Sequence, residues 1–230
     1  MSTIVTIRQQ LFSLAILVGL VFGQAARAAE QDTPASAQAL VSQTTESVMT
    51  VIMAAQDYAD EDPERYYGEI QTILDPLIDY RGFARNVMGP YASSKRYRSL
   101  DEAGRAQLRD QLDTFTDAMQ QSLIRTYGKG LLAFGEARIE VDMAEPEDAE
   151  SRMASVRQLI HTQNPQPYVV MYQMGRRDVA DDWQLRNVII ESVNLGEIYR
   201  DQFLSSAREY DGDLDQVIAN WTTVTVDVDS

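Results

Sequence analysis

The chain changes its hydrophobic period near Gly135, and this change constrains its fold more than any other feature. Before it, the stretch Asp79–Phe134 contains a long run in which apolar residues recur every three or four positions, which predicts an amphipathic helix. That stripe consists of Leu108, Leu112, Phe115, Met119, Leu123, Tyr127 and Leu131. After Gly135, apolar and charged residues alternate from Ala137 to Met143, as in a strand buried on one face. Helices followed by strands predict an α+β domain.

Three shorter helices are predicted before the long one. The first covers Ala39–Asp57, where apolar residues keep helical spacing. The second begins at Asp62-Pro63, with Asp as the N-cap and Pro in the first turn. The third covers Asp79–Met88 and ends at Gly89, a residue type that favours helix C-termini.

The long helix is predicted to start at a capping box, in which Ser99 is followed three residues later by Glu102. It is predicted to end near Gly128 or Gly130. The basic, aromatic segment Ala92–Arg98 in front of it is predicted to be a loop.

The second half of the chain predicts a four-stranded antiparallel sheet and two helices. The connections between strands hold only a few residues, which favours antiparallel pairing of neighbours. The strands are expected near Ala137–Met143, Ala154–Thr162, Tyr168–Met174 and Trp183–Val193, and the helices near Asn194–Tyr210 and Leu214–Trp221. A single domain is therefore expected over residues 39–222, with a tail at 223–230.

The N-terminus has the pattern of a secretory signal. Arg8 precedes the apolar run Leu11–Phe22, and Ala26-Arg27-Ala28 offers small residues at the two positions that a signal peptidase reads. The run is too short to cross a bilayer, which takes about 20 residues. We therefore expect a cleaved signal peptide at residues 1–28 and a flexible linker at 29–38; an uncleaved anchor is the alternative.

Charge and composition exclude several classes of protein. Without Arg8 and Arg27 the expected mature chain has 18 basic and 35 acidic residues, a net charge of −17. This excess argues against binding to nucleic acid or to an anionic bilayer, because both carry the same sign of charge. There is no cysteine, and hence no disulfide, thiol nucleophile or thiolate metal site.

No motif commits the chain to catalysis. His161 is the single histidine and lies in a predicted strand, with no serine context that would build a triad. The acidic residues gather in predicted turns without the spacing of a calcium loop. We therefore expect neither an enzyme nor a metal site.

Three segments resemble the MlaC-type family of periplasmic phospholipid-binding proteins, also called the toluene tolerance family. They are NVMGPY at Asn86–Tyr91, LRDQLDTFTDAMQQSLIRTYGKGL at Leu108–Leu131 and DWQLRNVIIESVNLGEIYRDQF at Asp182–Phe203. The resemblance implies a periplasmic carrier with a curved sheet in a cone similar to nuclear transport factor 2. It also implies phospholipid as the bound ligand, no cofactor, and two partners: an outer-membrane lipoprotein–porin complex and an inner-membrane ABC-type lipid transporter. Its expected role is to shuttle phospholipids between these complexes and so maintain outer-membrane lipid asymmetry.

A carrier of acyl chains needs apolar, adaptable walls, because each buried methylene contributes about 0.8 kcal/mol and an unpaired polar group would cost free energy. The residues that we expect to line such a pocket are Phe83, Val87, Met88, Tyr91, Leu112, Phe115, Met119, Leu123, Tyr127, Ile139, Val141, Val170, Tyr172, Ile189 and Val193. Each of them also suits an ordinary core.

A basic group stands out against the acidic background and suits a lipid head group, a docking partner or a solvated surface. It consists of Arg81, Arg85, Lys95, Arg96 and Arg98. Two other functions remain open from the sequence. One is an enzyme acting on a small molecule in the same cone-shaped fold, and the other is a structural or chaperone-like periplasmic protein.

Overall fold

The computed structural model describes residues 35–145, 148 and 150–221, which belong to one compact unit beginning at Ala35. The expected signal peptide, residues 29–34 of the expected linker and the tail at 223–230 lie outside the described residues. Among the helices that are described, none combines the length and the apolar character needed to cross a bilayer.

The helical half begins close to where the sequence predicts it. Its elements are α1 (Ala37–Ala55), α2 (Pro63–Leu74), α3 (Tyr80–Met88), the 3₁₀ turn η1 (Gly89–Ala92), α4 (Ser94–Ser99), α5 (Glu102–Leu131) and the 3₁₀ turn η2 (Leu132–Phe134). Side-chain oxygens of Ser36, Asp62 and Asp79 accept backbone N–H groups at the starts of α1, α2 and α3. Gly89 ends α3 with φ of +55°, a conformation that glycine adopts without a Cβ penalty.

Two predictions around the start of α5 are wrong. The segment expected to be a loop, Ala92–Arg98, contains the last residue of η1 and most of α4, with Ser93 as the N-cap of α4. The N-cap of α5 is Asp101, whose carboxylate accepts the Gly104 N–H at 2.8 Å. Ser99 instead ends α4, and its hydroxyl donates to Arg96 O at 2.7 Å. Serine and aspartate cap helices equally well, so only the chain reversal between α4 and α5 decides which of them is used.

The second half forms a five-stranded antiparallel sheet in the order β1-β2-β3-β4-β5. The strands are β1 (Arg138–Met143), β2 (Met153–His161), β3 (Tyr168–Gly175), β4 (Gln184–Ile190) and β5 (Val193–Asn194), followed by α6 (Leu195–Glu209) and α7 (Leu214–Ala219). The α+β class is confirmed, but the strand count of four is wrong. The fourth predicted strand is interrupted at Glu191, where φ of +56° turns the chain back, so that Val193 pairs with Ile190.

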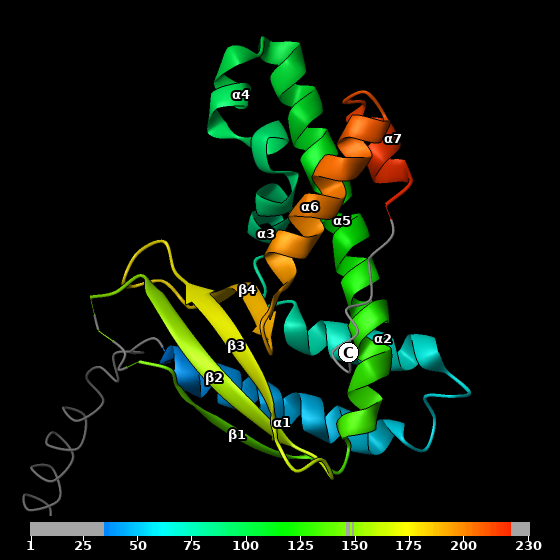
Figure 1. Cartoon of the computed structure of the whole chain (residues 1–230), viewed down its shortest axis with the longest axis vertical. Helices are drawn as coiled ribbons and strands as arrows, with labels where there is room; N and C mark the ends of the chain where they lie inside the picture. The colour runs from blue at the N-terminus through cyan, green and yellow to red at the C-terminus, as the bar shows by residue number, and fades with distance from the viewer. Residues whose placement is uncertain (1–34, 146–147, 149, 222–230) are drawn as a thin grey trace, which may run out of the picture. The chain divides into compact units, whose positions relative to one another are not determined.

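One half of α5 lies among helices. In Figure 1, α5 runs from α4 and α7 at one end to α2 at the other, and α3, α4 and α7 pack against it, while α6 packs on α3. The buried residues that these helices share are called the helical cluster: Phe83, Ala84, Val87, Met88, Ala92, Leu108, Leu112, Phe115, Met119, Leu195, Tyr199, Phe203, Ala207, Leu214, Val217 and Ile218.

A second cluster joins the sheet to α1, which packs on β1 and β2. This sheet cluster is formed by the buried residues Ala37, Val41, Leu77, Val156, Met174, Trp183 and Leu185. A smaller cluster joins α1 and α2 to the second half of α5 through Ala55, Ala59, Tyr66, Ile70 and Ile124. α5 contributes to the helical cluster and to this smaller cluster, so it links α3, α6 and α7 to α1 and α2.

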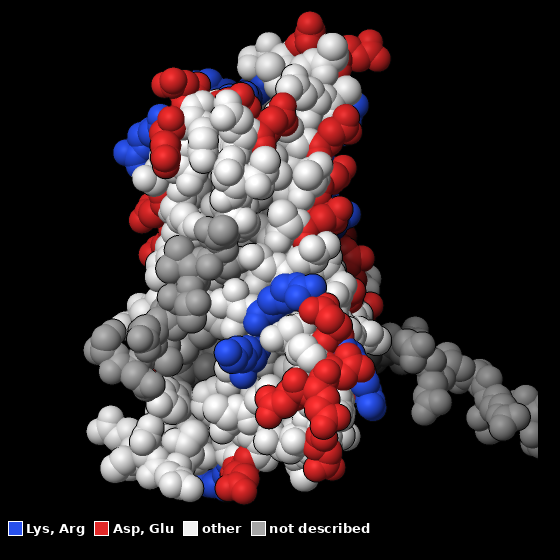
Figure 2. Space-filling model, turned by 90° about the vertical axis from the view of Figure 1, so that its right-hand side faces the viewer, with Lys and Arg blue, Asp and Glu red and all other residues white. Residues whose placement is uncertain are grey.

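The surface follows the acidic composition. On the face drawn in Figure 2, acidic side chains far outnumber basic ones, and a broad part of the face carries neither. A concentration of arginines anywhere on this chain is therefore unusual for its composition.

Candidate functional site

The predicted pocket residues of α3, and those of α5 up to Met119, lie inside the helical cluster. Each has at most 8% of its surface exposed: Phe83, Val87, Met88, Leu112, Phe115 and Met119. The Phe115 ring is 5.0 Å from that of Phe203 on α6 and 4.9 Å from that of Trp221, measured between centroids. These aromatic partners fill the space around Phe115, so the first half of the stripe forms closely packed core.

The later residues of the stripe are less enclosed. Leu123 and Tyr127 on α5 are only partly buried, and they pack at the edge of the helical cluster together with Val188, Ile190 and Val193 of the sheet. Tyr91, in η1, is also partly buried there. The stripe thus passes from closed core to partly buried positions at the edge of this cluster, against which sheet residues also pack. We call Leu123, Tyr127, Val188, Ile190 and Val193 the α5–sheet junction.

The strand register separates the predicted sheet residues by face. Val141 pairs with Gln158, which pairs with Val170. Ile139, paired with Ile160, lies two residues from Val141, and Tyr172 lies two residues from Val170. Because side chains alternate along a strand, these four predicted residues share one face. Val193 is opposite Ile190, and Ile190 is opposite Val170, which puts Val193 on the same inner face. Ile189 pairs with Met171 and lies on the other face. Five of the six predicted sheet residues therefore share a face, and Ile189 does not.

A chain of polar groups crosses this inner face, which the sequence did not indicate. The Tyr172 hydroxyl donates to Gln158 Oε1 at 2.8 Å, and Gln158 Nε2 donates to Thr45 Oγ1 on α1 at 2.8 Å. Thr45 in turn donates to Val41 O at 2.8 Å. Burial raises the pKa of the Tyr172 hydroxyl above its ordinary value. Gln158, 4% exposed, is thus satisfied on both sides and fixes the distance between α1 and the sheet.

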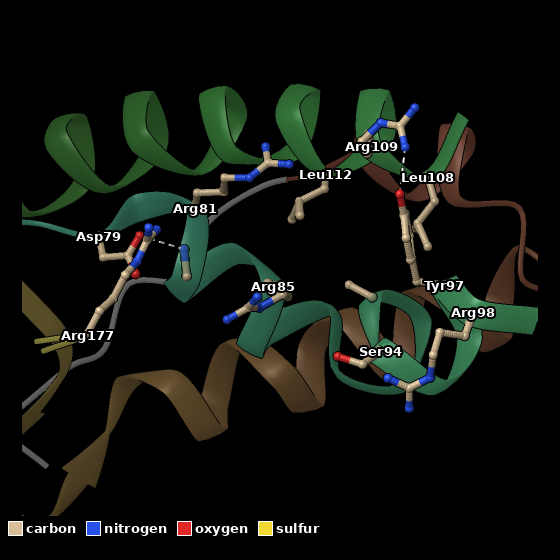
Figure 3. Close-up of a pocket in the computed structure, with 12 residues that line it drawn as sticks. Asp79, Arg81, Arg85, Ser94, Tyr97, Arg98, Leu108, Arg109, Leu112 and Arg177 are labelled. Carbon is tan, nitrogen blue, oxygen red and sulfur yellow. Dashed lines mark hydrogen bonds between the residues drawn. The ribbon is translucent and has the colours of Figure 1, made fainter. Parts of the chain in front are cut away.

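An arginine-lined cavity of about 430 Å³ opens beside α3. Five arginines and one aspartate are the charged residues among its lining: Asp79, Arg81, Gly82, Arg85, Ala92, Ser94, Tyr97, Arg98, Leu108, Arg109, Leu112 and Arg177. In Figure 3, Arg177 lies at the Asp79 end of the cavity and Arg98 at the α4 end, with Arg85 between them. The arginines are therefore spread along the cavity and do not converge on one point.

The structure gathers three residues of the predicted basic group around this cavity and leaves two outside. Arg81, Arg85 and Arg98 line it, and Arg109 and Arg177 join them. Lys95 is not part of the lining, and Arg96 lies over the Tyr91 ring at 5.5 Å. Arg109 lies in α5 next to Leu108, which also lines the cavity. Arg177 comes from the β3–β4 connection, so only the tertiary fold brings it to the cavity.

The five arginines differ in how they are held. Arg81 forms an ion pair with Asp113 of α5, and Arg109 donates to the Tyr97 hydroxyl at 2.7 Å. Among the described residues, the guanidinium groups of Arg85, Arg98 and Arg177 have no hydrogen bond or ion pair, and all three residues are exposed. Three positive charges are thus available at the cavity.

The Asp79 end of the cavity is fixed by contacts between α3 and β4. Asp79 caps α3 through Gly82 N at 2.9 Å and forms an ion pair with Arg186 of β4. Leu185 exchanges backbone hydrogen bonds with this segment, donating to Leu77 O at 2.8 Å and accepting from Asp79 N at 3.1 Å. Partial burial lowers the pKa of Arg186 from its ordinary value. The start of α3 is therefore held firmly on the sheet.

The single histidine of the chain lies beside one carboxylate. His161 ends β2, and its Nε2 atom lies 3.5 Å from an oxygen of Glu140 on the neighbouring strand. Across the residues that the structure describes, no three or more carboxylates and histidines are gathered as metal ligands would be. Two tyrosine hydroxyls meet inside the molecule at Tyr127 and Tyr199, whose oxygens are 2.7 Å apart.

Comparison with known proteins identifies the relatives of this fold. The family model of the MlaC protein matches residues 42–223. The chain belongs to the MlaC family. The toluene tolerance protein ttg2D of Pseudomonas putida is similar to it, with 28% identity over 182 residues that cover 79% of this chain and 78% of the relative. The family membership predicted from the sequence segments is thus confirmed.

A solved structure extends the comparison of this MlaC-family chain to three dimensions. The phospholipid-binding protein of Ralstonia solanacearum, solved in complex with a phospholipid, superposes with a TM-score of 0.62 at 20% sequence identity. The match covers 80% of this chain and 98% of the solved one. At this identity the likeness shows that the two proteins share this α+β fold.

Proposed function

We propose that this protein is a periplasmic phospholipid carrier without enzymatic activity. The observation that carries the proposal is the family match over residues 42–223, which includes α5, the whole sheet and α6. The structural relative from Ralstonia solanacearum, which holds a phospholipid, supports the same ligand class.

The α5–sheet junction is the part of the structure that suits acyl chains. It is apolar and only partly buried, and it adjoins the inner face of the sheet with Ile139, Val141, Val170 and Tyr172. A chain of about 16 carbons gains roughly 12 kcal/mol when its methylenes leave water, so the carrier must cover most of its length. The closed helical cluster supports this wall from behind, because its residues are already packed against one another.

The cellular role follows from the same proposal. A cleaved N-terminal signal delivers the chain to the periplasm, where it receives phospholipid from one membrane complex and delivers it to another, an outer-membrane lipoprotein–porin complex and an inner-membrane ABC-type transporter. This traffic maintains outer-membrane lipid asymmetry. The net charge of −17 expected for the chain after cleavage, from 18 basic and 35 acidic residues, supports transfer through protein partners, since an anionic bilayer repels the protein.

The test is direct measurement of bound lipid. The protein is purified from bacterial periplasm without detergent, extracted with organic solvent and analysed by mass spectrometry, and then mixed with vesicles that contain labelled phospholipid. We expect phospholipid in a fixed ratio to protein and uptake of the label. A protein that carries no lipid and takes none up from vesicles would refute the proposal.

Adjacent residues of β4 provide a matched pair of variants. Ile190 lies on the inner face at the junction and Ile189 on the outer face, and both are partly buried. We expect Ile190→Asn to lower bound phospholipid several-fold and Ile189→Asn to leave it near the parent value, with circular dichroism confirming that both fold. Equal lipid content in the two variants would place the acyl chains elsewhere. Phe115→Asp is a poorer test, because Phe115 is fully enclosed and a charge there acts first on folding.

A further inference from the structure

We infer that the arginine-lined cavity is a docking site for an acidic segment of a partner protein. The inference goes beyond lipid carriage, because it concerns a surface formed by α3, α4, α5 and the β3–β4 connection and not the α5–sheet junction. The occupant that fits is an extended peptide rich in aspartate and glutamate.

The cavity is positively charged although the chain as a whole is acidic. The full chain has 35 acidic and 20 basic residues, yet the lining of this cavity includes five arginines and a single carboxylate, that of Asp79. The Asp79 carboxylate is already paired with Arg186, and Arg81 with Asp113. Arg85, Arg98 and Arg177 therefore give the cavity an excess of positive charge within an otherwise acidic molecule, which favours an anionic partner.

The arginines without a partner among the described residues are spaced along the cavity (Figure 3). Arg177, Arg85 and Arg98 follow one another along the cavity in Figure 3, from the β3–β4 connection to α4. A single phosphate is best held by guanidinium groups that converge on it, often two bonds to each. Arginines in a row instead match carboxylates spaced along a peptide, and arginine is the residue that pairs most readily with carboxylates at interfaces.

The cavity also has apolar lining residues, and the helices around it are held together by hydrogen bonds. Ala92, Leu108 and Leu112 also line the cavity, each at most 8% exposed, and their exposed atoms add apolar contact for the methylene parts of glutamate side chains. The surrounding elements are held in place, since Arg105 Nε donates to Tyr97 O at 3.1 Å and Arg109 to the Tyr97 hydroxyl. A preformed surface lowers the entropy lost when a flexible partner binds.

Binding is measured with a defined probe. A fluorescein-labelled peptide of about ten residues with alternating glutamate and serine spans about 33 Å when extended. Its fluorescence polarisation is followed on adding the full-length secreted protein, beside a peptide in which every glutamate is glutamine. We expect the acidic peptide alone to bind, and its affinity to fall as sodium chloride screens the charges.

Charge-reversal variants locate the site. Arg85→Glu combined with Arg98→Glu removes two of the free charges, and we expect the affinity to fall about tenfold or more, because reversed charges repel the peptide. The matched control combines Lys129→Glu with Arg208→Glu, which makes the same change in net charge at exposed helical positions outside the cavity lining. The control is expected to stay within about twofold of the parent. Equal losses in both variants would overturn the inference, since net charge alone would then explain binding.

Other occupants give different results. If inorganic phosphate or vesicles of anionic phospholipid bind through Arg85 and Arg98 while the peptide does not, the cavity is an oxyanion site and the inference is wrong. A dimer in low salt that the double variant abolishes would make a second copy of this acidic chain the occupant, which also overturns it. Phospholipid content is measured on every variant, so that a loss of docking with lipid retained separates this inference from the proposed carrier function.

Discussion

The hydroxyl oxygens of Tyr127 on α5 and Tyr199 on α6 lie 2.7 Å apart, at the edge of the helical cluster. Tyr199 is fully enclosed, and its ring also contacts Phe83 and Trp221. The hydrogen bond links the helix that carries the apolar stripe to the helix that follows the sheet. It is therefore a sensitive probe of whether the two parts are packed as the structure shows.

We expect the two tyrosines to be energetically coupled. Tyr127→Phe, Tyr199→Phe and the double variant form a cycle in which the coupling is about 0.5–1.5 kcal/mol in the free energy of unfolding, the usual net contribution of one such hydrogen bond. Urea denaturation followed by circular dichroism measures it. Additive losses, with no coupling, would show that the two hydroxyls are not bonded in solution.

Stability is expected to fall at alkaline pH. Burial raises the pKa of Tyr80, Tyr127, Tyr172 and Tyr199, and it raises that of Tyr66 to about 12, whereas the ordinary value is 10.0. A raised pKa in the folded state means that the unfolded chain loses its protons first. The stabilising contribution is thus complete below pH 10 and is lost as pH rises above it. Urea midpoints between pH 8 and pH 11 test this on either side of the ordinary tyrosine pKa of about 10. A flat profile across that range would contradict the burial of these hydroxyls.

The buried amide of Gln158 is expected to be a stability determinant. Gln158→Leu leaves Tyr172 and Thr45 without their shared partner, and we expect a loss of about 1–3 kcal/mol, the usual cost of an unsatisfied buried polar group. Gln173→Leu on the exposed side of β3 serves as the control and is expected to change stability by less than about 0.5 kcal/mol. Similar unfolding free energies for both variants would count against the polar chain.

Replacement of glycine by alanine is expected to have opposite effects on stability at two helical positions, Gly82 and Gly68. A Cβ at Gly82 would collide with the Asp79 carboxylate and lie 3.1 Å from Arg186 Nη1, so Gly82→Ala is expected to destabilise the protein. Gly68 in α2 has no atom within 4 Å of the added carbon, and Gly68→Ala is expected to stabilise by about 0.5–1 kcal/mol. Thermal denaturation distinguishes them, and stabilisation by both would mean that Asp79 does not cap α3 as described.

The N-cap of α5 is testable in the same way. Asp101→Ala removes the side chain that accepts the Gly104 N–H and is expected to cost about 1 kcal/mol. Ser99→Ala should have little effect on α5, because Ser99 bonds within α4. A larger loss of stability from Ser99→Ala than from Asp101→Ala would indicate that Ser99 caps α5, as the sequence predicted, and that Asp101 does not.

Local patterns predicted the elements well because they act over one or two turns. The stripe from Leu108 to Leu131 and the alternation around Ile139 each reflect a single helix or strand, and Asp62 and Gly89 mark ends through their own backbone preferences. The break of the fourth predicted strand at Glu191 was not predicted, because glutamate is not a typical turn residue. Its positive φ accompanies the pairing of β4 with β5.

The sites were harder to predict because they depend on contacts between distant segments. Phe115 and Leu123 belong to one stripe, but only the positions of α6 and the sheet decide that the first is enclosed and the second lies at the junction. Similarly, Ile189 and Ile190 read alike in the sequence, and a one-residue difference in register places them on opposite faces. Arg177 is distant in sequence from Arg85 and meets the same cavity through the β3–β4 connection.

The length of α5 has a mechanical consequence. Its 30 residues extend about 45 Å without a break. Leu108, Arg109 and Leu112 on its first half line the arginine-lined cavity, and Leu123 and Tyr127 on its second half form the apolar junction with the sheet. A shift of this continuous helix along its own axis therefore moves the cavity residues and the junction residues together.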